Sequence, residues 1–229
     1  MIDIHSHILP EMDDGSQSLS ETRQLLQMLQ QQGVRVLAAT PHFYGMQDTP
    51  EAFLDRREKS FRQLKELETD IKILPGAEVA YFDGMSHCQQ LFDLRLGDSK
   101  LLLVEMPFID WSERMVHELC QLPLQLGLTP VLAHVERYRR REQLPRFEKM
   151  LMAQGICMQC NAEAFLNLGS RRWALSRLKQ GEICFLGSDA HNLTTRAPKL
   201  DRAATVIRKK LGDTVLQELM QQAEELLSL

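Results

Sequence analysis

The chain has 229 residues, of which 44% are hydrophobic and 25% are charged, and its formal net charge is -4. This length and composition predict a single domain, residues 1–229, with one sizeable core. The negative charge argues against a protein that binds nucleic acid by broad neutralisation of phosphates. No apolar run approaches the length of a bilayer-spanning helix, and the amino terminus has neither a basic leader nor the apolar stretch of a signal peptide. We therefore expect a cytoplasmic protein without membrane insertion.

Short β-rich runs alternate with segments of helical periodicity along the whole chain. The predicted strands are 2–5, 34–40, 71–79, 101–106, 129–134, 156–161 and 182–188. The predicted helices are 20–32, 51–68, 112–126, 141–154, 171–180, 199–211 and 214–227. This alternation predicts an α/β fold with a parallel sheet, and seven units without a linker favour closure into a single-domain, TIM-barrel-like (β/α)7 barrel. An open doubly wound sheet is the alternative, and the last helix is expected to complete the outer ring.

Possible metal ligands stand at the carboxyl end of nearly every predicted strand. His5 and His7 follow the first strand, and because residues i and i+2 of an extended segment point to the same side, they can hold one cation together. Asp189 and His191 repeat this spacing after the last strand. Parallel strands bring their carboxyl ends together at one face, so these side chains are expected to converge.

Two glutamates end apolar runs in the same way. Glu78 follows Leu74-Pro75-Gly76-Ala77, and Glu105 follows Leu101-Leu102-Leu103-Val104. A buried carboxylate without a partner is costly, which favours a bound cation at each position.

With Asp14 from the loop after the first strand, the predicted ligands number nine: His5, His7, Asp14, His42, Glu78, Glu105, His134, Asp189 and His191. Nine ligands are too many for one ion and suit two or three ions that generate hydroxide at neutral pH. A nitrogen and oxygen set without thiolate fits manganese, iron or zinc. His87 and His117 lie in predicted helices and are interpreted as ordinary structural residues.

The five cysteines form no disulfide framework, which fits a reducing compartment. Cys157 and Cys160 form a CxxC, a spacing found in redox and zinc sites. In a buried strand, however, this spacing places the two thiols on opposite faces, so we interpret both as packing residues.

Several motifs together resemble the PHP (polymerase and histidinol phosphatase) superfamily, and within it the bacterial manganese-dependent protein-tyrosine phosphatases of the CpsB and YwqE type. The matching segments are MIDIHSHI at 1–8, DDG at 13–15, GAE at 76–78, AHVERY at 133–138 and SDAHN at 188–192. They occur in family order from Met1 to at least Pro198. The chain departs from the family pattern at Phe43 and Tyr44, where basic residues are expected.

The resemblance implies a distorted barrel of the PHP fold in which the nine residues hold three divalent metal ions, manganese in the first place. It implies that Arg137 and Arg196 hold the substrate phosphate, since a guanidinium can bond two phosphate oxygens at once. The implied reaction is hydrolysis of protein phosphotyrosine by a metal-activated hydroxide. The implied partner is a bacterial tyrosine autokinase of polysaccharide export, with a role in capsule or exopolysaccharide synthesis.

The cysteines support this chemistry negatively, because none is followed six positions later by the arginine of a thiol-dependent phosphatase loop. Three alternatives stay open: a phosphatase of a small metabolite such as histidinol phosphate, a nuclease-type phosphodiesterase, and a metal-stabilised binding module without activity.

The surroundings of the predicted site are less constrained by the sequence. Residues 139–141 are three arginines, interpreted mainly as a solvated helix start. Loop aromatics are candidates either for packing or for flanking a substrate ring, with neither favoured. These aromatics are Phe43, Tyr44, Phe82, Phe108 and Trp111.

Overall fold

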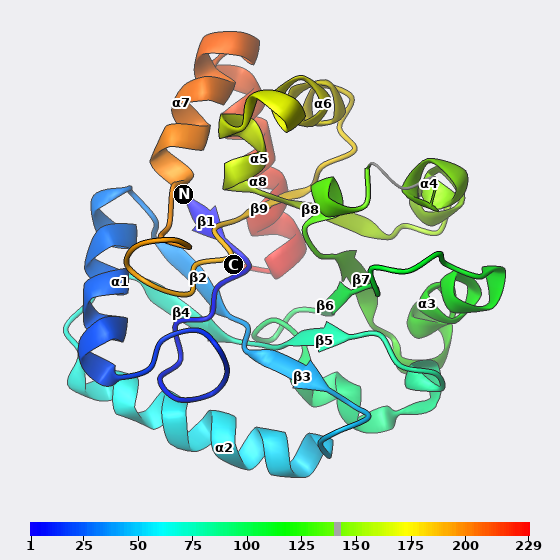
Figure 1. The fold of residues 1–229 in the computed structure, drawn as a ribbon, viewed down its shortest axis with the longest axis horizontal. Coiled ribbons are helices and arrows are strands. Elements are labelled where there is room, and N and C mark those ends of the chain that lie inside the picture. The colour runs from blue at the N-terminus through cyan, green and yellow to red at the C-terminus, as the bar shows by residue number, and fades with distance from the viewer. Residues whose placement is uncertain (140–142) are drawn as a thin grey trace.

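The computed structural model describes residues 1–139 and 143–229, and Figure 1 shows helices surrounding a group of parallel strands. The strands are β1 (Ile2–Asp3), β2 (Val36–Ala39), β3 (His42–Tyr44), β4 (Lys72–Pro75), β5 (Glu78–Ala80), β6 (Leu101–Glu105), β7 (Thr129–Leu132), β8 (Cys157–Asn161) and β9 (Phe185–Gly187). The α-helices are α1 (Leu19–Gln31), α2 (Pro50–Gln63), α3 (Glu113–Leu126), α4 (Gln143–Ala153), α5 (Ala162–Leu166), α6 (Leu168–Lys179), α7 (Leu200–Leu211) and α8 (Asp213–Leu227). Single turns of 3₁₀ helix lie at η1 (Leu64–Glu66), η2 (Met85–His87) and η4 (Val135–Arg137), and a longer one at η3 (Gln89–Leu94).

The strands pair in two parallel sheets, β1-β2-β4 and β3-β5-β6-β7-β8-β9. The predicted strand 34–40 corresponds to β2, and β3, which follows Pro41, was not predicted. Pro41 has no N–H for the ladder and separates the two. The predicted strand 71–79 is wrong as a continuous element, because it is broken into β4 and β5 at Gly76, where a Cβ would lie 2.7 Å from a methyl group of Leu96. With β2 and β3 counted as one strand, and β4 and β5 as another, seven parallel strands follow one another in chain order.

The last strand returns to the first, which closes the ring. Ile4 N donates to Leu186 O over 3.3 Å, and Asp189 N donates to His5 O over 2.8 Å. A parallel bridge also joins Ser6 to Ala190. The predicted distorted barrel is therefore confirmed over the open sheet.

Alternate residues of the strands face two separate apolar clusters. Ile4, Leu103 and Phe185 belong to the barrel interior, and Leu102 and Leu186 belong to the larger cluster between strands and helices. Cys157 lies in the interior cluster and Cys160 in the outer one. The expectation that the two thiols occupy opposite faces is confirmed.

Helix α8 does not simply complete the outer ring, as the amphipathic pattern predicted. Its residues Ala223 and Leu227 join the interior cluster, against Ile2 and Phe185 at the starts of their strands. The helix therefore closes the amino-terminal end of the barrel. Amphipathicity shows that a helix has a buried face but not which cluster that face joins.

Most helix ends agree with the sequence signals within a few residues. Ser18 caps α1 and Ser112 caps α3, and Gly127 ends α3 in the left-handed conformation with φ 66°. The short α5 was not predicted. In the described part of the chain, no helix has both the length and the apolar composition needed to cross a membrane.

Candidate metal centre

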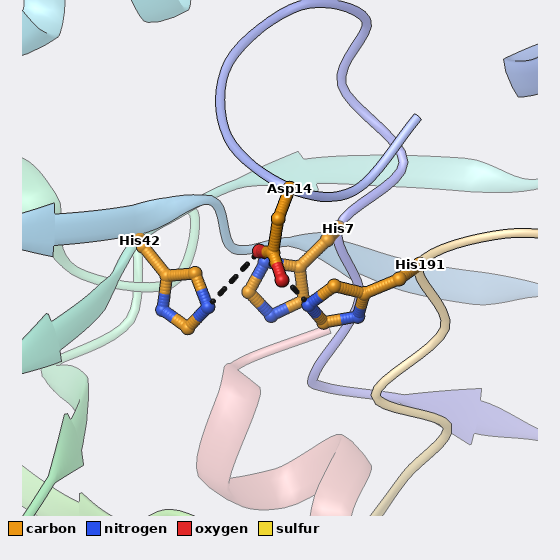
Figure 2. Close-up of side chains that lie close together, drawn as sticks. All are labelled: His7, Asp14, His42 and His191. Atoms are coloured by element: carbon orange, nitrogen blue, oxygen red, sulfur yellow. Dashed lines mark ion pairs between the residues drawn. The ribbon is translucent and has the colours of Figure 1, made fainter. Parts of the chain in front are cut away.

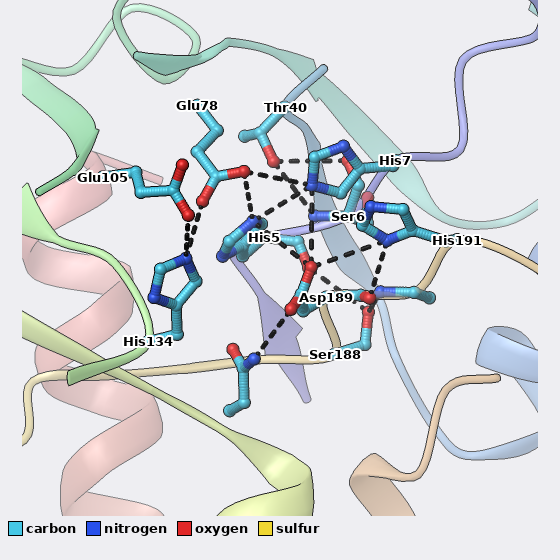
Figure 3. Close-up of polar contacts among 12 residues, drawn as sticks. His5, Ser6, His7, Thr40, Glu78, Glu105, His134, Ser188, Asp189 and His191 are labelled. Atoms are coloured by element: carbon cyan, nitrogen blue, oxygen red, sulfur yellow. Dashed lines mark hydrogen bonds and ion pairs between the residues drawn. The ribbon is translucent and has the colours of Figure 1, made fainter. Parts of the chain in front are cut away.

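The nine predicted ligands meet at the carboxyl ends of the strands, as Figures 2 and 3 show. Within the described residues, eight of them form three overlapping groups whose ligand atoms lie within 4.8 Å of one another. The groups are His7, Asp14, His42 and His191; His5, His7 and Asp189; and His42, Glu78 and Glu105. His134 adjoins the third group, with its Nε2 2.9 Å from Glu78 Oε1 and 3.1 Å from Glu105 Oε1.

The two histidines of the opening His-x-His point to the same side, as their spacing predicts. His5 and His7 turn toward the same side, with their Nε2 atoms 3.2 Å apart. Ser6 between them points away and donates from its Oγ to Ala38 O over 2.7 Å. The hydrogen bond to β2 holds the segment in its extended form, so both imidazoles reach the same point.

Two predicted ligands have a backbone conformation that few non-glycine residues adopt. His134 has φ 33° and Asp189 has φ 51°. Such left-handed conformations cost free energy and persist where surrounding contacts impose them, often at functional sites. Each residue lies two positions after the end of its strand, and its side chain contacts the cluster.

Glu78 lies at the centre of the site and is almost completely buried, with 1% of its side chain exposed. Its Oε2 is 2.9 Å from His42 Nδ1 and 3.2 Å from His5 Nε2. The sequence predicts that this buried carboxylate needs a cationic partner. The imidazoles around Glu78 are consistent with that prediction.

Four buried atoms in this cluster test whether cations fit: His42 Nδ1, Glu78 Oε2, His134 Nδ1 and His191 Nε2. His42 Nδ1 and Glu78 Oε2 lie 2.9 Å apart as an ion pair, yet none of the four atoms makes a hydrogen bond of acceptable geometry among the described residues. Buried polar atoms are normally paired, and all four can offer a lone pair to a divalent cation. The residues therefore fit a metal centre of nitrogen and oxygen ligands.

The electrostatics of the ligands point the same way. Burial opposes the charged imidazole, yet hydrogen bonds to Asp13 and Glu78 raise the pKa of His7 to about 10. At His134, burial is likewise outweighed by Glu105 and Glu78, and the pKa rises to about 9. Burial and the neighbouring charge of His7 lower the pKa of His191 to about 4. Without a bound cation, protons on His7 and His134 balance the buried carboxylates.

The two predicted phosphate-binding arginines meet at one carboxylate. Arg137 pairs through Nη2 with Asp189 Oδ2, and Arg196 Nη2 lies 2.8 Å from Asp189 Oδ1. Despite its burial, the charges of His5 and Arg137 hold the pKa of Asp189 well below its usual value. The arginines and Asp189 also line a small cleft beside Ser188 and Lys199.

Sequence reasoning missed Asp13, which orients a ligand. Asp13 Oδ2 accepts from His7 Nδ1 over 2.7 Å and from His42 N over 2.8 Å. A proton on Nδ1 leaves Nε2 of His7 free to bind a cation, the usual role of a carboxylate behind a metal ligand. The adjacent Asp13-Asp14 pair was the available signal, and only Asp14 was assigned a role.

Sequence reasoning also missed the polar pair Gln159 and Asn161 on β8. Gln159 Oε1 accepts from His134 N over 2.7 Å and lies 3.1 Å from His5 Nδ1. Its Nε2 donates to Asn161 Oδ1, and Asn161 Nδ2 donates to Asp189 over 2.9 Å. Polar side chains at alternate positions of a buried strand were the signal that could have identified them.

Other predicted residues lie outside the cluster. His87 and His117 are exposed and belong to none of the ligand groups, which is consistent with their interpretation as ordinary residues without a role in the site. Arg139 donates to the backbone oxygens of Glu136 and Gly169 rather than lying free in solvent. Arg140 and Arg141 lie outside the described residues.

The loop aromatics fall into two sets. Phe43 and Trp111 are buried packing residues, and Phe82 is partly buried against Gly45. Tyr44 and Phe108 are 41% and 43% exposed, and each stacks on a predicted metal ligand.

Comparisons with known proteins agree with this geometry. The chain is 34% identical over 96% of its length to the tyrosine-protein phosphatase CpsB of Streptococcus pneumoniae, covering 94% of that protein. It is 31% identical over 99% of its length to the tyrosine-protein phosphatase YwqE of Bacillus subtilis, covering 91% of that protein. A chain from crystal structures of YwqE and CpsB, described as metal-dependent tyrosine phosphatases, superimposes with a TM-score of 0.85 at 29% identity, covering all of this chain and 94% of that one. The model of the capsular polysaccharide synthesis family CpsB/CapC matches residues 1–228, and the chain belongs to that family.

Proposed function

We propose that the protein is a metal-dependent protein-tyrosine phosphatase that acts in capsular or exopolysaccharide synthesis. One observation carries this proposal: nine nitrogen and oxygen donors and two arginines converge at one end of the barrel. The full-length similarity to named tyrosine phosphatases supports the same activity.

The proposed ligands are the nine residues that the sequence predicts, and the proposed cofactor is three divalent cations, manganese first, with iron or zinc as alternatives. Divalent cations in such a site neutralise phosphate charge and supply a hydroxide nucleophile at neutral pH.

The protein's own residues prepare the site before substrate arrives. Hydrogen bonds from Nδ1 of His7 to Asp13 and from Nδ1 of His191 to the Asp189 carbonyl keep each Nε2 unprotonated once a cation displaces a proton. Gln159 Oε1 gives His5 the same orientation. Three imidazoles are thus held in one tautomer.

Arg137 and Arg196 are proposed to hold the phosphate of the substrate. Each guanidinium carries five N–H donors, so one edge can stay on Asp189 while the other bonds phosphate oxygens. Charge on those oxygens is then stabilised by groups that are already oriented.

The cysteines are not proposed to act as nucleophiles. Cys160 is fully buried in the outer cluster, and burial raises the pKa of its thiol well above the ordinary value. No disulfide forms among the five cysteines, which supports a reducing, cytoplasmic location. The proposed substrate protein is a bacterial tyrosine kinase of polysaccharide export.

The test is turnover of a phosphotyrosine peptide, a phosphoserine peptide and histidinol phosphate by the manganese-loaded protein. We expect phosphotyrosine to be cleaved selectively. Arg196→Ala should lower this activity by roughly 100-fold, since the arginine acts on charge that develops in the transition state. Arg62→Ala, on the exposed face of α2 and paired only with Glu58 among the described residues, is the matched control and should keep full activity.

Other outcomes would reassign the site. Preference for histidinol phosphate would keep the metal chemistry and replace the substrate, and cleavage of nucleic-acid ends would indicate a phosphodiesterase. If no phosphoester is hydrolysed after full metal loading, the protein is a binding module.

A further inference from the structure

Two half-exposed aromatic side chains border the metal centre. Tyr44 ends β3 and stacks on His42, with ring centroids 5.4 Å apart and planes inclined by 24°. Phe108 follows β6 and stacks on His134, with centroids 6.0 Å apart and planes inclined by 21°. His42 and His134 contact different oxygens of Glu78, so the two aromatics border the same carboxylate from different sides.

The strand register places Tyr44 and the segment that leads to Phe108 on the two sides of β5. Tyr44 pairs with Ala80 on β5, and Ala80 pairs with Glu105 on β6. Residues in register on neighbouring strands present their side chains on the same face, and two strand spacings amount to roughly 10 Å. Phe108 comes three residues after Glu105. The small side chain of Ala80 therefore lies between an aromatic residue on one side and the segment that carries another.

Neighbouring contacts hold the Phe108 ring and the backbone of Tyr44. Phe108 stacks on Tyr138, with centroids 5.5 Å apart, and Tyr138 donates its hydroxyl to Met106 O over 2.9 Å. Trp111 packs against the other side of this group and donates from Nε1 to Pro107 O. On the other loop, the Tyr44 carbonyl accepts from Gln47 N over 2.8 Å and from Asp48 N over 3.0 Å. A rigid aromatic loses little entropy when it binds a ligand.

We propose that Tyr44 and Phe108 form the two walls of a subsite for the phenyl ring of phosphotyrosine and determine the preference for aryl over alkyl phosphate monoesters. This inference rests on the proposed phosphatase function. Exposed aromatic faces leave apolar surface in contact with water unless a ligand covers them. A neutral ring that stacks on these faces removes that surface from water, which is favourable. An alkyl phosphate, such as phosphoserine, has no ring to fill the space.

The test compares the kcat/KM of phenyl phosphate with that of glycerol phosphate, and of phosphotyrosine with phosphoserine peptides of one sequence. Each variant is compared with the unchanged protein by the ratio of aryl to alkyl activity, which cancels differences between leaving groups. Phe108→Leu and Tyr44→Leu should each lower this ratio about fivefold, mainly through KM, and the double variant about 25-fold, since the two side chains act separately. Bound manganese and alkyl turnover should not change.

Phe92→Leu is the matched control, because Phe92 is 42% exposed on η3 and lies under the Arg95 guanidinium rather than beside a predicted metal ligand. Its ratio should stay that of the unchanged protein. An unaltered ratio in Phe108→Leu and Tyr44→Leu would overturn the subsite. Parallel loss of aryl activity, alkyl activity and manganese would also overturn it, since the aromatics would then only support the ligands. An unchanged protein that cleaves alkyl but not aryl esters would overturn both the subsite and the proposed function.

Discussion

The two ends of the barrel differ in the polarity of the side chains that face inward, although the same strands supply both ends. At the amino-terminal end, Ile2, Leu101 and Phe185 face inward against α8. At the carboxyl end, the inward positions become Glu105 on β6 and Gln159 on β8. One end therefore stabilises the fold by burying apolar surface. The other buries charge and orients it, which contributes to function rather than to stability.

The strongest test of this division is Glu78→Gln, which removes one charge from the centre of the cluster without changing its size. We expect loss of bound manganese and a fall in phosphatase activity of more than about 100-fold, beyond the range for residues that only support a ligand. Metal analysis and turnover measure both effects. Glu118, another buried carboxylate, accepts a hydrogen bond from Ser86 and belongs to none of the three ligand groups, so Glu118→Gln should retain metal and activity. Equal losses in both variants would contradict the division.

At the opposite end, Leu101→Ala should act on stability alone. Leu101 is buried in the interior cluster at the start of β6, and its truncation should lower the free energy of unfolding by about 2–5 kcal/mol. Denaturant unfolding measures this change, and turnover of the folded, metal-loaded variant should be unaltered. Leu124→Ala, 78% exposed on α3, should leave the free energy of unfolding nearly unchanged. A loss of turnover per bound metal in Leu101→Ala would show that the two ends are coupled.

The release of protons on metal binding is a second property that we expect only of the carboxyl end of the barrel. The raised pKa values of His7, about 10, and His134, about 9, mean that both are protonated at pH 7 without a cation. A metal ion must displace these protons, so affinity should rise with pH and fall as acid is added below those pKa values. We expect on the order of two protons released per protein. Calorimetric titrations with manganese in two buffers of different ionisation enthalpy measure this number, and its absence would contradict the assignment.

A smaller effect is expected from Gln159→Leu, which should weaken manganese binding by about 10- to 100-fold. The change leaves His5 Nδ1 and His134 N without their shared acceptor. Gln159→Glu keeps an acceptor at this position and should restore most of the affinity. Exposed Gln154→Leu is the control. Unchanged manganese affinity in Gln159→Leu would show that Gln159 does not orient the predicted ligands.

The sequence predicted which side chains meet at this end of the barrel, because most of them follow a strand. Strand ends at Glu78, Glu105 and Asp189 combine apolar runs with a terminal charge, which is readable without a structure. The strand β3 after Pro41 and the break at Gly76 were missed, because the pairing of β3 with β5 and the close approach of Leu96 to Gly76 arise only in the folded chain. Asp13 and Gln159 act on ligands 6 and 154 residues away along the chain, and their partners become visible only in the folded chain.

The left-handed backbone at His134 and Asp189 was also beyond prediction. Histidine and aspartate adopt a positive φ more often than most non-glycine residues but still rarely, and here the conformation depends on surrounding hydrogen bonds. The destination of α8 was wrong for a similar reason. Its apolar face was readable, but the cluster that it enters is decided by how the barrel closes.

The most direct test of the metal-centre account is a manganese titration of chelator-treated protein, with bound metal and phosphotyrosine-peptide turnover measured in the same samples. The account predicts that stripped protein is inactive and that turnover rises in step with bound manganese in the unchanged protein but not in Glu78→Gln. Full turnover by the stripped protein, or turnover that does not follow bound metal, would contradict it.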